Sequence, residues 1–274
     1  MRAIVILASK EFCDGIRNRW FLGATGALMV FALGLTFVGS APLGSVGVDR
    51  VAVTTVSLTS LAVFLLPLMA LLLSYDALVG EVERGTMALL LTYPVARWQV
   101  VAGKFIGQTF GLGAATITGF GVAAVFLVVL SPGSANWHGY LLLVASSVWL
   151  GAVFVAIGLV ISGLPQQRGA AAALAFIVWL VFVVMYDMAL LGGLVADQAA
   201  IIGPALFNFL LLLNPADAFR MLNLAGVEDI RVAAGLLGAE MAGGLALSGA
   251  LVSLLVWTLL PLGLAVGIFH RKSL

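Results

Sequence analysis

The chain alternates between long apolar runs and short polar segments. A helix needs about 20 apolar residues to cross the hydrocarbon core of a bilayer. Six runs reach that length and predict transmembrane helices over residues 20–39, 51–73, 106–130, 140–163, 170–192 and 245–269. A seventh run, 198–213, is shorter and contains Pro204 and Asn208, so it predicts a periplasmic or partly embedded helix. The pattern indicates an all-α membrane protein with a single membrane domain over residues 1–274.

The first 19 residues have a different pattern, in which apolar and charged residues alternate with helical periodicity. At 100° per residue, one face of the predicted helix carries the apolar residues Val5, Ala8, Phe12 and Ile16. The opposite face carries the charged residues Lys10, Asp14 and Arg17. An amphipathic helix of this kind lies in the membrane interface with its basic residues toward anionic headgroups. We favour an interfacial helix over residues 1–19; a solvated cytoplasmic tail is the alternative.

The longest polar-rich interruption is residues 74–108, between the second and third predicted spans. It carries six charged residues: Asp76, Glu81, Glu83, Arg84, Arg97 and Lys104. Gly85 can end a short helix in the left-handed conformation, and Thr86 can cap the next helix, Met87 to Thr92. Pro94 can stop that helix and begin another.

A short helix outside the membrane with adjacent leucines, Leu89 to Leu91, is suited to a groove in another protein. The alternative, a solvated loop, does not explain those leucines. We therefore expect residues 74–105 to connect the membrane part to a soluble partner.

The positions of the basic residues predict the orientation of the chain. With six spans and the N-terminus inside, ten basic residues lie in the cytoplasm: Arg2, Lys10, Arg17, Arg19, Arg84, Arg97, Lys104, Arg168, Arg271 and Lys272. Three lie outside: Arg50, Arg220 and Arg231. This excess satisfies the positive-inside rule. A seventh span would move Arg271 and Lys272 outside, so six spans with both termini cytoplasmic is the preferred topology.

The third predicted span has small residues at every fourth position: Gly103, Gly107, Gly111, Ala115, Gly119 and Ala123. This spacing allows two helix backbones to approach closely. We favour packing within one chain over a dimer seam.

The composition excludes several classes of protein. Charged residues make up 9% of the chain, against about a quarter in soluble domains. The single cysteine, Cys13, rules out an internal disulfide framework, and the two histidines, His138 and His270, are too few and too far apart to sandwich haems within the chain. The sequence contains no GxxxxGK[ST], HExxH or GxSxG motif. Any use of ATP therefore belongs to another subunit.

Asp187 is the exception to the absence of charge in the spans, and Met185 and Met188 flank it. Charges inside a bilayer are costly and often functional, and thioethers suit Cu(I), so a substrate or partner contact is one interpretation. An interfacial acid with methionines filling gaps is the other, and we favour it.

The segment between the fifth and sixth spans, residues 193–244, is the largest predicted periplasmic region. Within it, Asn214-Pro215 favours a turn, and Asp217 can open the helix that follows. The segment is too short for a catalytic domain but long enough for two short helices that dock a partner.

These motifs together resemble a known family. The residues Glu81-x-Glu83-x-Gly85-Thr86, then Leu89-Leu90-Leu91-Thr92-x-Pro94, Arg97 and Lys104, resemble the coupling-helix region of six-span ABC transporter permeases of the exporter type. The resemblance extends to the N-terminal residues Lys10-Glu11-Phe12 and Asp14-Gly15-x-Arg17-Asn18-Arg19-Trp20. With residues 214–220, NPADAFR, the chain is most similar to the membrane subunits of nitrous-oxide-reductase maturation systems.

The resemblance implies roles for specific residues. Contact with the ATPase is implied for Glu81, Glu83, Gly85, Thr86, Leu89 and Leu90, with Pro94 and Arg97 bracing the exit of the segment. Contact with a periplasmic partner is implied for Asp217, Phe219 and Arg220.

It also implies an assembly in the bacterial inner membrane. Two copies of this chain would form a homodimer, surrounded by membrane lipids, over a dimer of separate ABC ATPase subunits that bind ATP and Mg²⁺. A periplasmic repeat protein would sit on the outer side. The chain itself would bind no cofactor, catalyse no reaction and contact no nucleic acid.

The implied function in denitrification is support of copper–sulfur centre assembly in nitrous oxide reductase, by mechanical signalling or by export of a sulfur or copper species. A lipid or hydrophobic-peptide ABC exporter, or a structural anchor of a respiratory complex, is the alternative.

Overall fold

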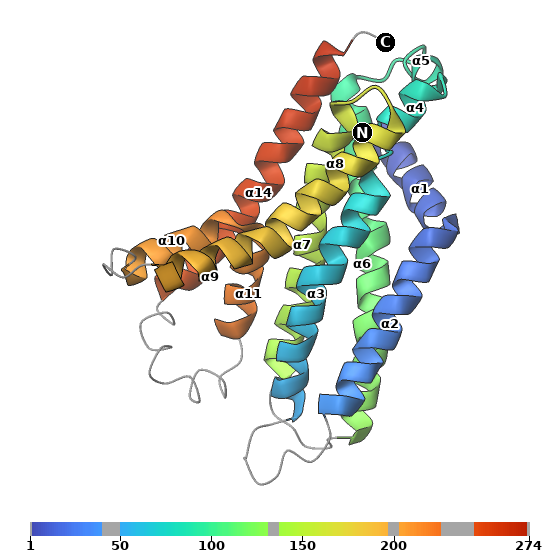
Figure 1. Ribbon diagram of the computed structural model, residues 1–274. Coiled ribbons are helices and arrows are strands. Elements are labelled where there is room, and N and C mark those ends of the chain that lie inside the picture. Colours follow the sequence, from blue (N-terminus) through green and yellow to red (C-terminus); the bar gives the residue numbers. More distant parts are fainter. Residues whose placement is uncertain (1, 40–49, 131–136, 197–202, 226–243, 273–274) are drawn as a thin grey trace.

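The computed structural model describes residues 2–39, 50–130, 137–196, 203–225 and 244–272, and these residues are almost entirely helical (Figure 1). The helices are α1 (Arg2–Arg17), α2 (Arg19–Gly39), α3 (Arg50–Ser74), α4 (Val79–Glu83), α5 (Thr86–Leu90), α6 (Arg97–Leu130), α7 (Trp137–Gly163), α8 (Arg168–Leu180), the π-helical turn η1 (Val181–Met185), α9 (Tyr186–Ala196), α10 (Pro204–Leu213), α11 (Pro215–Ala225) and α14 (Gly244–Arg271). The described part of the chain contains no strand, which confirms the all-α prediction.

Six helices within the described ranges are long and apolar enough to span a membrane: Arg19–Phe37, Arg50–Glu83, Arg97–Val129, Trp137–Gly163, Arg168–Val195 and Leu247–Arg271. Each corresponds to one of the six predicted apolar runs. The weak seventh run falls on α10, which is followed by α11 after a bend of 116°. The bent pair is a broken span or a re-entrant segment, because neither half alone is long enough to cross a bilayer.

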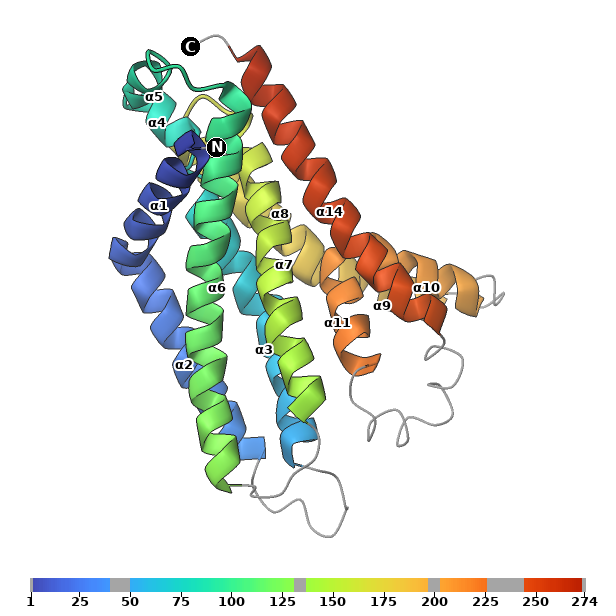
Figure 2. The same cartoon turned by 180° about the vertical axis from the view of Figure 1, so that it is seen from behind.

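α7 lies at the centre of the bundle, and 72% of its most apolar stretch is buried. It is apolar on every side, as expected of a buried helix. α3 packs very close to it, since a Cβ on Gly158 would lie 1.7 Å from the Ser74 hydroxyl oxygen. α6, α11 and α14 contact α7 from other sides (Figure 2).

The small-residue face of α6 receives α1 and α2. A Cβ on Gly107 would lie 2.4 Å from the carbonyl oxygen of Ala8, and one on Gly103 would lie 2.6 Å from the Leu7 Cβ. Farther along, Gly119 faces Leu28 of α2. The prediction that this stripe packs within the chain is confirmed.

α1 packs differently from the expected interfacial helix with a single apolar face. Its buried residues are Leu7 and Gly15, on the side that meets α6. Val5, Ile6 and Ile16 are exposed. The helix thus has one face against protein and a second apolar face turned outward, because the charged residues between them pair with α4 and α6 rather than with solvent alone.

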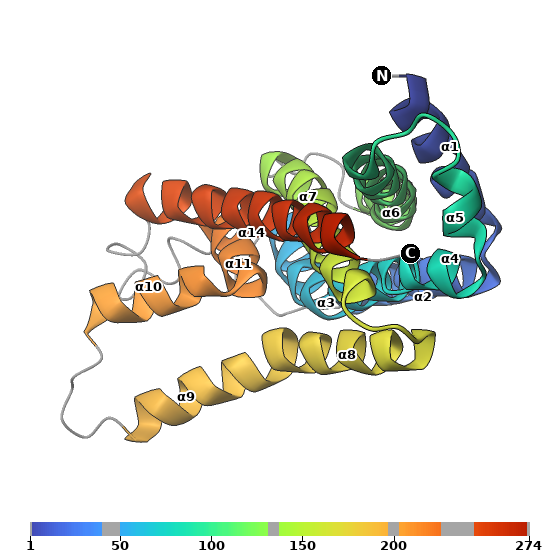
Figure 3. The ribbon, with the colours of Figure 1, turned by 90° about the horizontal axis from the view of Figure 1, so that it is seen from above.

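α8, η1 and α9 form one long helix that leaves the bundle and runs beside α10 (Figure 3). The opposite, more compact end of the molecule gathers α4, α5, the start of α1 and the end of α14 (Figure 1). We call this the α4–α5 end.

Candidate functional site

The α4–α5 segment has the turn that the sequence predicts at Gly85. This glycine has a φ of +74°, and no atom lies within 4 Å of the position a Cβ would take. The conformation, rather than lack of space, therefore favours glycine here. Thr86 differs from its predicted role: it is the first residue of α5, and its hydroxyl donates to the Glu81 carbonyl oxygen at 3.2 Å instead of capping the helix.

α5 is shorter than predicted and presents a different face. It ends at Leu90, and its Met87 is completely buried against the core. Leu89 is 68% exposed, whereas Leu90 is half-buried. Pro94 lies three residues before α6 begins at Arg97, so it does not open that helix as expected. The exposed apolar tip therefore consists of Leu89 and Tyr93, which is also 68% exposed.

A buried ion-pair network ties α4 to α1 and α6. The Lys104 ammonium lies 2.7 Å from a Glu11 carboxylate oxygen and 2.8 Å from a Glu81 carboxylate oxygen. Lys10 contacts the same Glu81 oxygen at 3.2 Å, and the Gln108 amide donates to Glu11 at 3.1 Å. Only 2% of the Lys104 side chain is exposed. Such a charge is stable in a buried site because both carboxylates and their hydrogen bonds offset its loss of water.

Lys10 marks the solvent edge of this network. Burial alone would lower the pKa of its ammonium group, but the Glu81 carboxylate beside it outweighs that effect, and the pKa of Lys10 is raised above its usual value. The network lines a polar pocket of about 160 Å³ that also includes Asn18 and Leu73.

A second group of charges joins α4 and its flanking turn to α8. Arg168, at the start of α8, lies 2.8 Å from Asp76 and 3.3 Å from Glu83. Arg84 approaches Asp76 at 3.9 Å. Gly80 leaves room for these contacts, because a Cβ there would collide with both Asp76 and Arg168.

α7 contributes an interaction that sequence reasoning missed. The Ser162 hydroxyl accepts hydrogen bonds from the backbone N–H groups of Leu78 at 2.8 Å and Val79 at 3.1 Å. These are unpaired donors at the start of α4, which a local side chain satisfies in most helices. A cap from 84 residues away leaves no signal in the local sequence.

Arg97 binds the C-terminal end of α14. Its guanidinium donates to the carbonyl oxygens of Phe269, His270 and Lys272, each at 2.9 Å, and lies over the Phe269 ring. A cation at the C-terminus of a helix complements its dipole. Lys272 in turn donates to the carbonyl oxygens of Gly163, the last residue of α7, and of Pro165, two residues later.

The α4–α5 end is therefore a small rigid element with polar or charged attachments to α1, α6, α7 and α8, while the exit from the segment is attached to α14. Its tip is exposed and apolar. Short hydrogen bonds and ion pairs thus connect this segment to five helices, α1, α6, α7, α8 and α14.

The residues expected to face a periplasmic partner lie elsewhere and are largely buried. In the chain alone Asp217 is 3% exposed and Phe219 is fully buried, which leaves neither side chain available for direct contact in this structure. The reason is that α11 packs against α3, α7 and α14 instead of standing outside the bundle. Arg220 remains partly exposed. Most of the predicted segment 193–244 beyond α11 lies outside the described residues.

Asp187 belongs to a network that the sequence did not reveal. Arg220 bridges Asp187 and Asp217, the latter at 2.8 Å. The Asn214 amide donates to Asp217 at 3.0 Å and to the Phe182 carbonyl oxygen, within η1, at 2.8 Å. This network pins α11 to the π-helical turn.

Met185 and Met188 are 54% and 68% exposed and appear in none of these polar contacts. Within the described ranges no group of three or more histidine, cysteine, aspartate or glutamate residues is placed to hold a metal ion. A function for the methionine pair stays a prediction.

Six apolar helices of membrane-spanning length, with a short helical segment attached at one end, define a multi-pass membrane protein. The chain belongs to the ABC-2 family of transporter proteins, which it matches over residues 5–274. It is 41% identical over 277 aligned positions to a protein of Stutzerimonas stutzeri described as a probable ABC transporter permease protein NosY, with 99% of each chain covered. A protein of Pseudomonas aeruginosa PAO1 with the same description is 40% identical over the full length of both chains.

Proposed function

We propose that this chain is the membrane subunit of an ABC complex in which a separate, NosF-like ATPase dimer drives movement of the permease. The movement serves assembly of the copper–sulfur centre of nitrous oxide reductase through a NosD-like periplasmic repeat protein. The full-length similarity to two proteins described as NosY supports this branch of the family. The absence of a nucleotide-binding motif from the sequence supports a separate ATPase.

The observation that carries the proposal is the geometry of α4 and α5. Leu89 and Tyr93 form an exposed apolar tip on a segment whose base is fixed by Lys104, Arg168 and Ser162. A rigid apolar helix outside the membrane fits a groove in a partner protein. The ion pairs at its base would let the segment move the attached helices, because a flexible attachment would absorb the partner's motion.

Closure of the ATPase dimer would push the tip of α5 and tilt the attached helices as rigid bodies. α11 packs against α7 and α14, so the same tilt would also move α11. We favour mechanical signalling over export of a sulfur or copper species, because the spans contain almost no charged residues to line a path for an ion. Two copies in a homodimer complete this arrangement.

The orientation follows from the same proposal. The α4–α5 end faces the cytoplasm of a bacterial inner membrane, where the ATPase and its ATP are found. The basic residues at this end of the molecule, including Arg84, Arg97, Arg168 and Lys272, agree with the positive-inside rule.

Site-specific cross-linking tests the contact. Cys13 is exposed and must first be changed to serine. In that background, Leu89→Cys carries a benzophenone maleimide in the complex co-expressed with its ATPase. Val128→Cys, 56% exposed near the other end of α6, is the matched control. We expect an adduct with the ATPase from position 89 and none from position 128; equal yields, or no adduct at 89, contradict the proposal.

The maturation function needs a separate measurement. We expect a strain lacking this chain to produce nitrous oxide reductase protein at normal levels but without its copper–sulfur centre, as measured by copper content and visible absorption. A fully loaded enzyme in that strain favours a lipid or peptide exporter instead. Failure to co-purify any ATPase under gentle extraction favours a structural anchor.

A further inference from the structure

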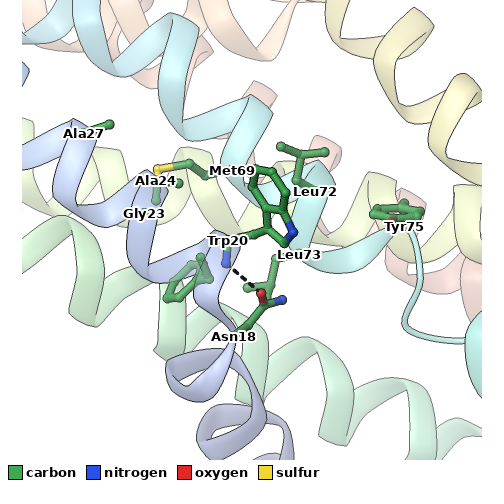
Figure 4. Close-up of a pocket in the computed structure, with 10 residues that line it drawn as sticks. Asn18, Trp20, Gly23, Ala24, Ala27, Met69, Leu72, Leu73 and Tyr75 are labelled. Atoms are coloured by element: carbon green, nitrogen blue, oxygen red, sulfur yellow. Dashed lines mark hydrogen bonds between the residues drawn. The ribbon is translucent and has the colours of Figure 1, made fainter.

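An apolar crevice of about 640 Å³ lies between α2 and α3, beside the turn that joins α1 to α2 (Figure 4). Its volume is within the range of roughly 300–1,000 Å³ usual for sites that bind small molecules. Small residues of α2 and longer apolar residues of α3 form most of its lining: Gly23, Ala24, Ala27, Met69, Leu72 and Leu73. A slender apolar group fits this lining.

One end of the crevice is amphipathic. Trp20, Tyr75 and Asn18 are placed there, and the Asn18 side-chain oxygen accepts a hydrogen bond from the Trp20 backbone N–H at 3.0 Å. The Trp20 side chain is 89% exposed even though it begins a span. Tryptophan and tyrosine gather at the level of lipid headgroups, where one part of the ring is apolar and another meets water.

Two arginines adjoin Asn18 in the sequence. Arg17 and Arg19 are the immediate neighbours of Asn18, and both are exposed. Neither forms an ion pair with any described residue, in contrast to Lys10, Arg84 and Lys104 in the adjoining polar pocket, which all contact carboxylates. Unpaired guanidinium groups bind phosphate with two parallel hydrogen bonds.

We propose that this crevice binds an anionic phospholipid, with one acyl chain between α2 and α3 and the phosphate at Arg17 and Arg19. The charge at the mouth favours this occupant over a second copy of the chain, since arginines facing identical arginines would repel. Asn18 and Leu73 line both this crevice and the polar pocket around Lys104. The lipid would therefore rest against the joint of α1, α2 and α4. This site is independent of what the complex transports or signals.

Filling the crevice tests the acyl-chain part. At Gly23 a Cβ would meet no atom within 4 Å, so Gly23→Phe extends into the crevice without a clash at its base. Gly34 on the same helix is equally open but does not line the crevice, so Gly34→Phe is the matched control. The probe is an equal mixture of phosphatidylglycerol and phosphatidylcholine added to the purified full chain, with bound lipid detected by mass spectrometry of the intact protein.

We expect wild type and Gly34→Phe to retain phosphatidylglycerol and Gly23→Phe to lose most of it. Equal retention by both variants overturns the proposal. A change from dimer to monomer in Gly23→Phe, with retention unaltered, also overturns it and assigns the crevice to a subunit contact.

Neutralising the arginines tests the headgroup part. Each basic residue near an anionic lipid contributes about fivefold to binding, so Arg17→Gln with Arg19→Gln should lower the preference for phosphatidylglycerol by up to about 30-fold. Arg17→Lys with Arg19→Lys should restore most of that preference. An unchanged preference in the glutamine variant contradicts the assignment of the phosphate to these arginines.

Discussion

At the scale of single residues, the α4–α5 end depends on two unusual positions. Gly85 holds a left-handed backbone conformation that permits the chain to reverse between α4 and α5. Lys104 is a cation buried where two carboxylates from different helices meet. The first sets the direction of the exposed tip, and the second fixes its base.

Gly85→Val should weaken the connection between ATP hydrolysis and movement while the chain still inserts. A left-handed conformation costs an L-residue about 1–2 kcal/mol, and the tip would relax to avoid it. The measurement is the ATPase activity of the assembled complex together with the yield of the Leu89→Cys adduct. Gly85→Asn should keep most of both, because asparagine enters this conformation more readily. Normal coupling in the valine variant contradicts this explanation of the turn.

Lys104→Met should destabilise the chain strongly. It leaves Glu11 and Glu81 buried with much less compensation, and breaking a buried ion pair costs roughly 3–5 kcal/mol. Thermal unfolding in detergent measures the loss. Combining Lys104→Met with Glu11→Gln and Glu81→Gln should recover stability, because no uncompensated charge remains. A triple variant no better than the single one argues that Lys104 acts through packing alone.

At the scale of helices, close packing depends on glycines that leave room for atoms of the neighbouring helix. α6 accepts α1 at Gly103 and Gly107, and α7 accepts α3 at Gly158. Hydrogen bonds and ion pairs then determine which helices pack together. Polar contacts of this kind also hold α11, since Asn214 bonds to η1 and Arg220 pairs with Asp187 of α9.

Gly107→Ala should push α1 away from α6. The added methyl would lie 2.4 Å from a backbone carbonyl oxygen of Ala8, which cannot rotate aside as a side chain can. Overpacking of this kind costs roughly 1–3 kcal/mol, which a lower thermal unfolding midpoint in detergent would record. Gly121→Ala is the control on the same helix, since a Cβ there meets nothing within 4 Å. Equal midpoints for the two variants contradict the packing assignment.

Asp187 and Arg220 should differ in their sensitivity to substitution. Asp187→Asn should be nearly silent in stability and membrane level, since Arg220 keeps Asp217 as its partner. Arg220→Gln removes the cation from Asp217, which is almost fully buried, and should cost roughly 3–5 kcal/mol. Thermal unfolding of the two purified variants compares them. Loss of maturation in Asp187→Asn at a normal membrane level would instead identify Asp187 as a functional site.

At the scale of the whole molecule, the α4–α5 end collects the polar attachments, whereas α11 and its network lie against α3, α7 and α14 part-way along the bundle (Figure 1). In the proposed function, a push on the tip would reach α11 through α7 and α14, because α11 packs against both helices. This arrangement agrees with the proposed subunit, which transmits motion while a separate subunit hydrolyses ATP.

The α4–α5 end should lie on the cytoplasmic side of the membrane. In the Cys13→Ser background, Leu89→Cys should react with a membrane-impermeant maleimide in inside-out vesicles and not in right-side-out vesicles. The benzophenone experiment uses the same variant, so the two results can be compared at the same expression level. Reaction only in right-side-out vesicles reverses the orientation and removes the basis for contact with an ATPase.

Much of the fold follows from local patterns. The six spans, the α6 glycine stripe and the turn at Gly85 were predictable because hydrophobic length, small-residue spacing and glycine conformation are properties of short segments. The roles of Thr86 and Pro94 were wrong. The Thr86 hydroxyl bonds back to the Glu81 carbonyl oxygen instead of capping α5, and α6 begins at Arg97 rather than at Pro94. Asp217 and Phe219 were expected at a surface, but the structure buries them. The sequence of α11 alone does not show which helices pack against it.

By itself the sequence determined that this protein lies in a membrane as six helices, with a polar segment between the second and third, because the cost of burying charge in lipid dictates where apolar runs must be. Only the tertiary structure decided which helices hold that segment. Ser162, Lys104 and Arg97 each act on residues 23 to 175 positions away. Such partners are set by how the helices pack, since a hydrogen bond or ion pair depends on distance in space and not along the chain.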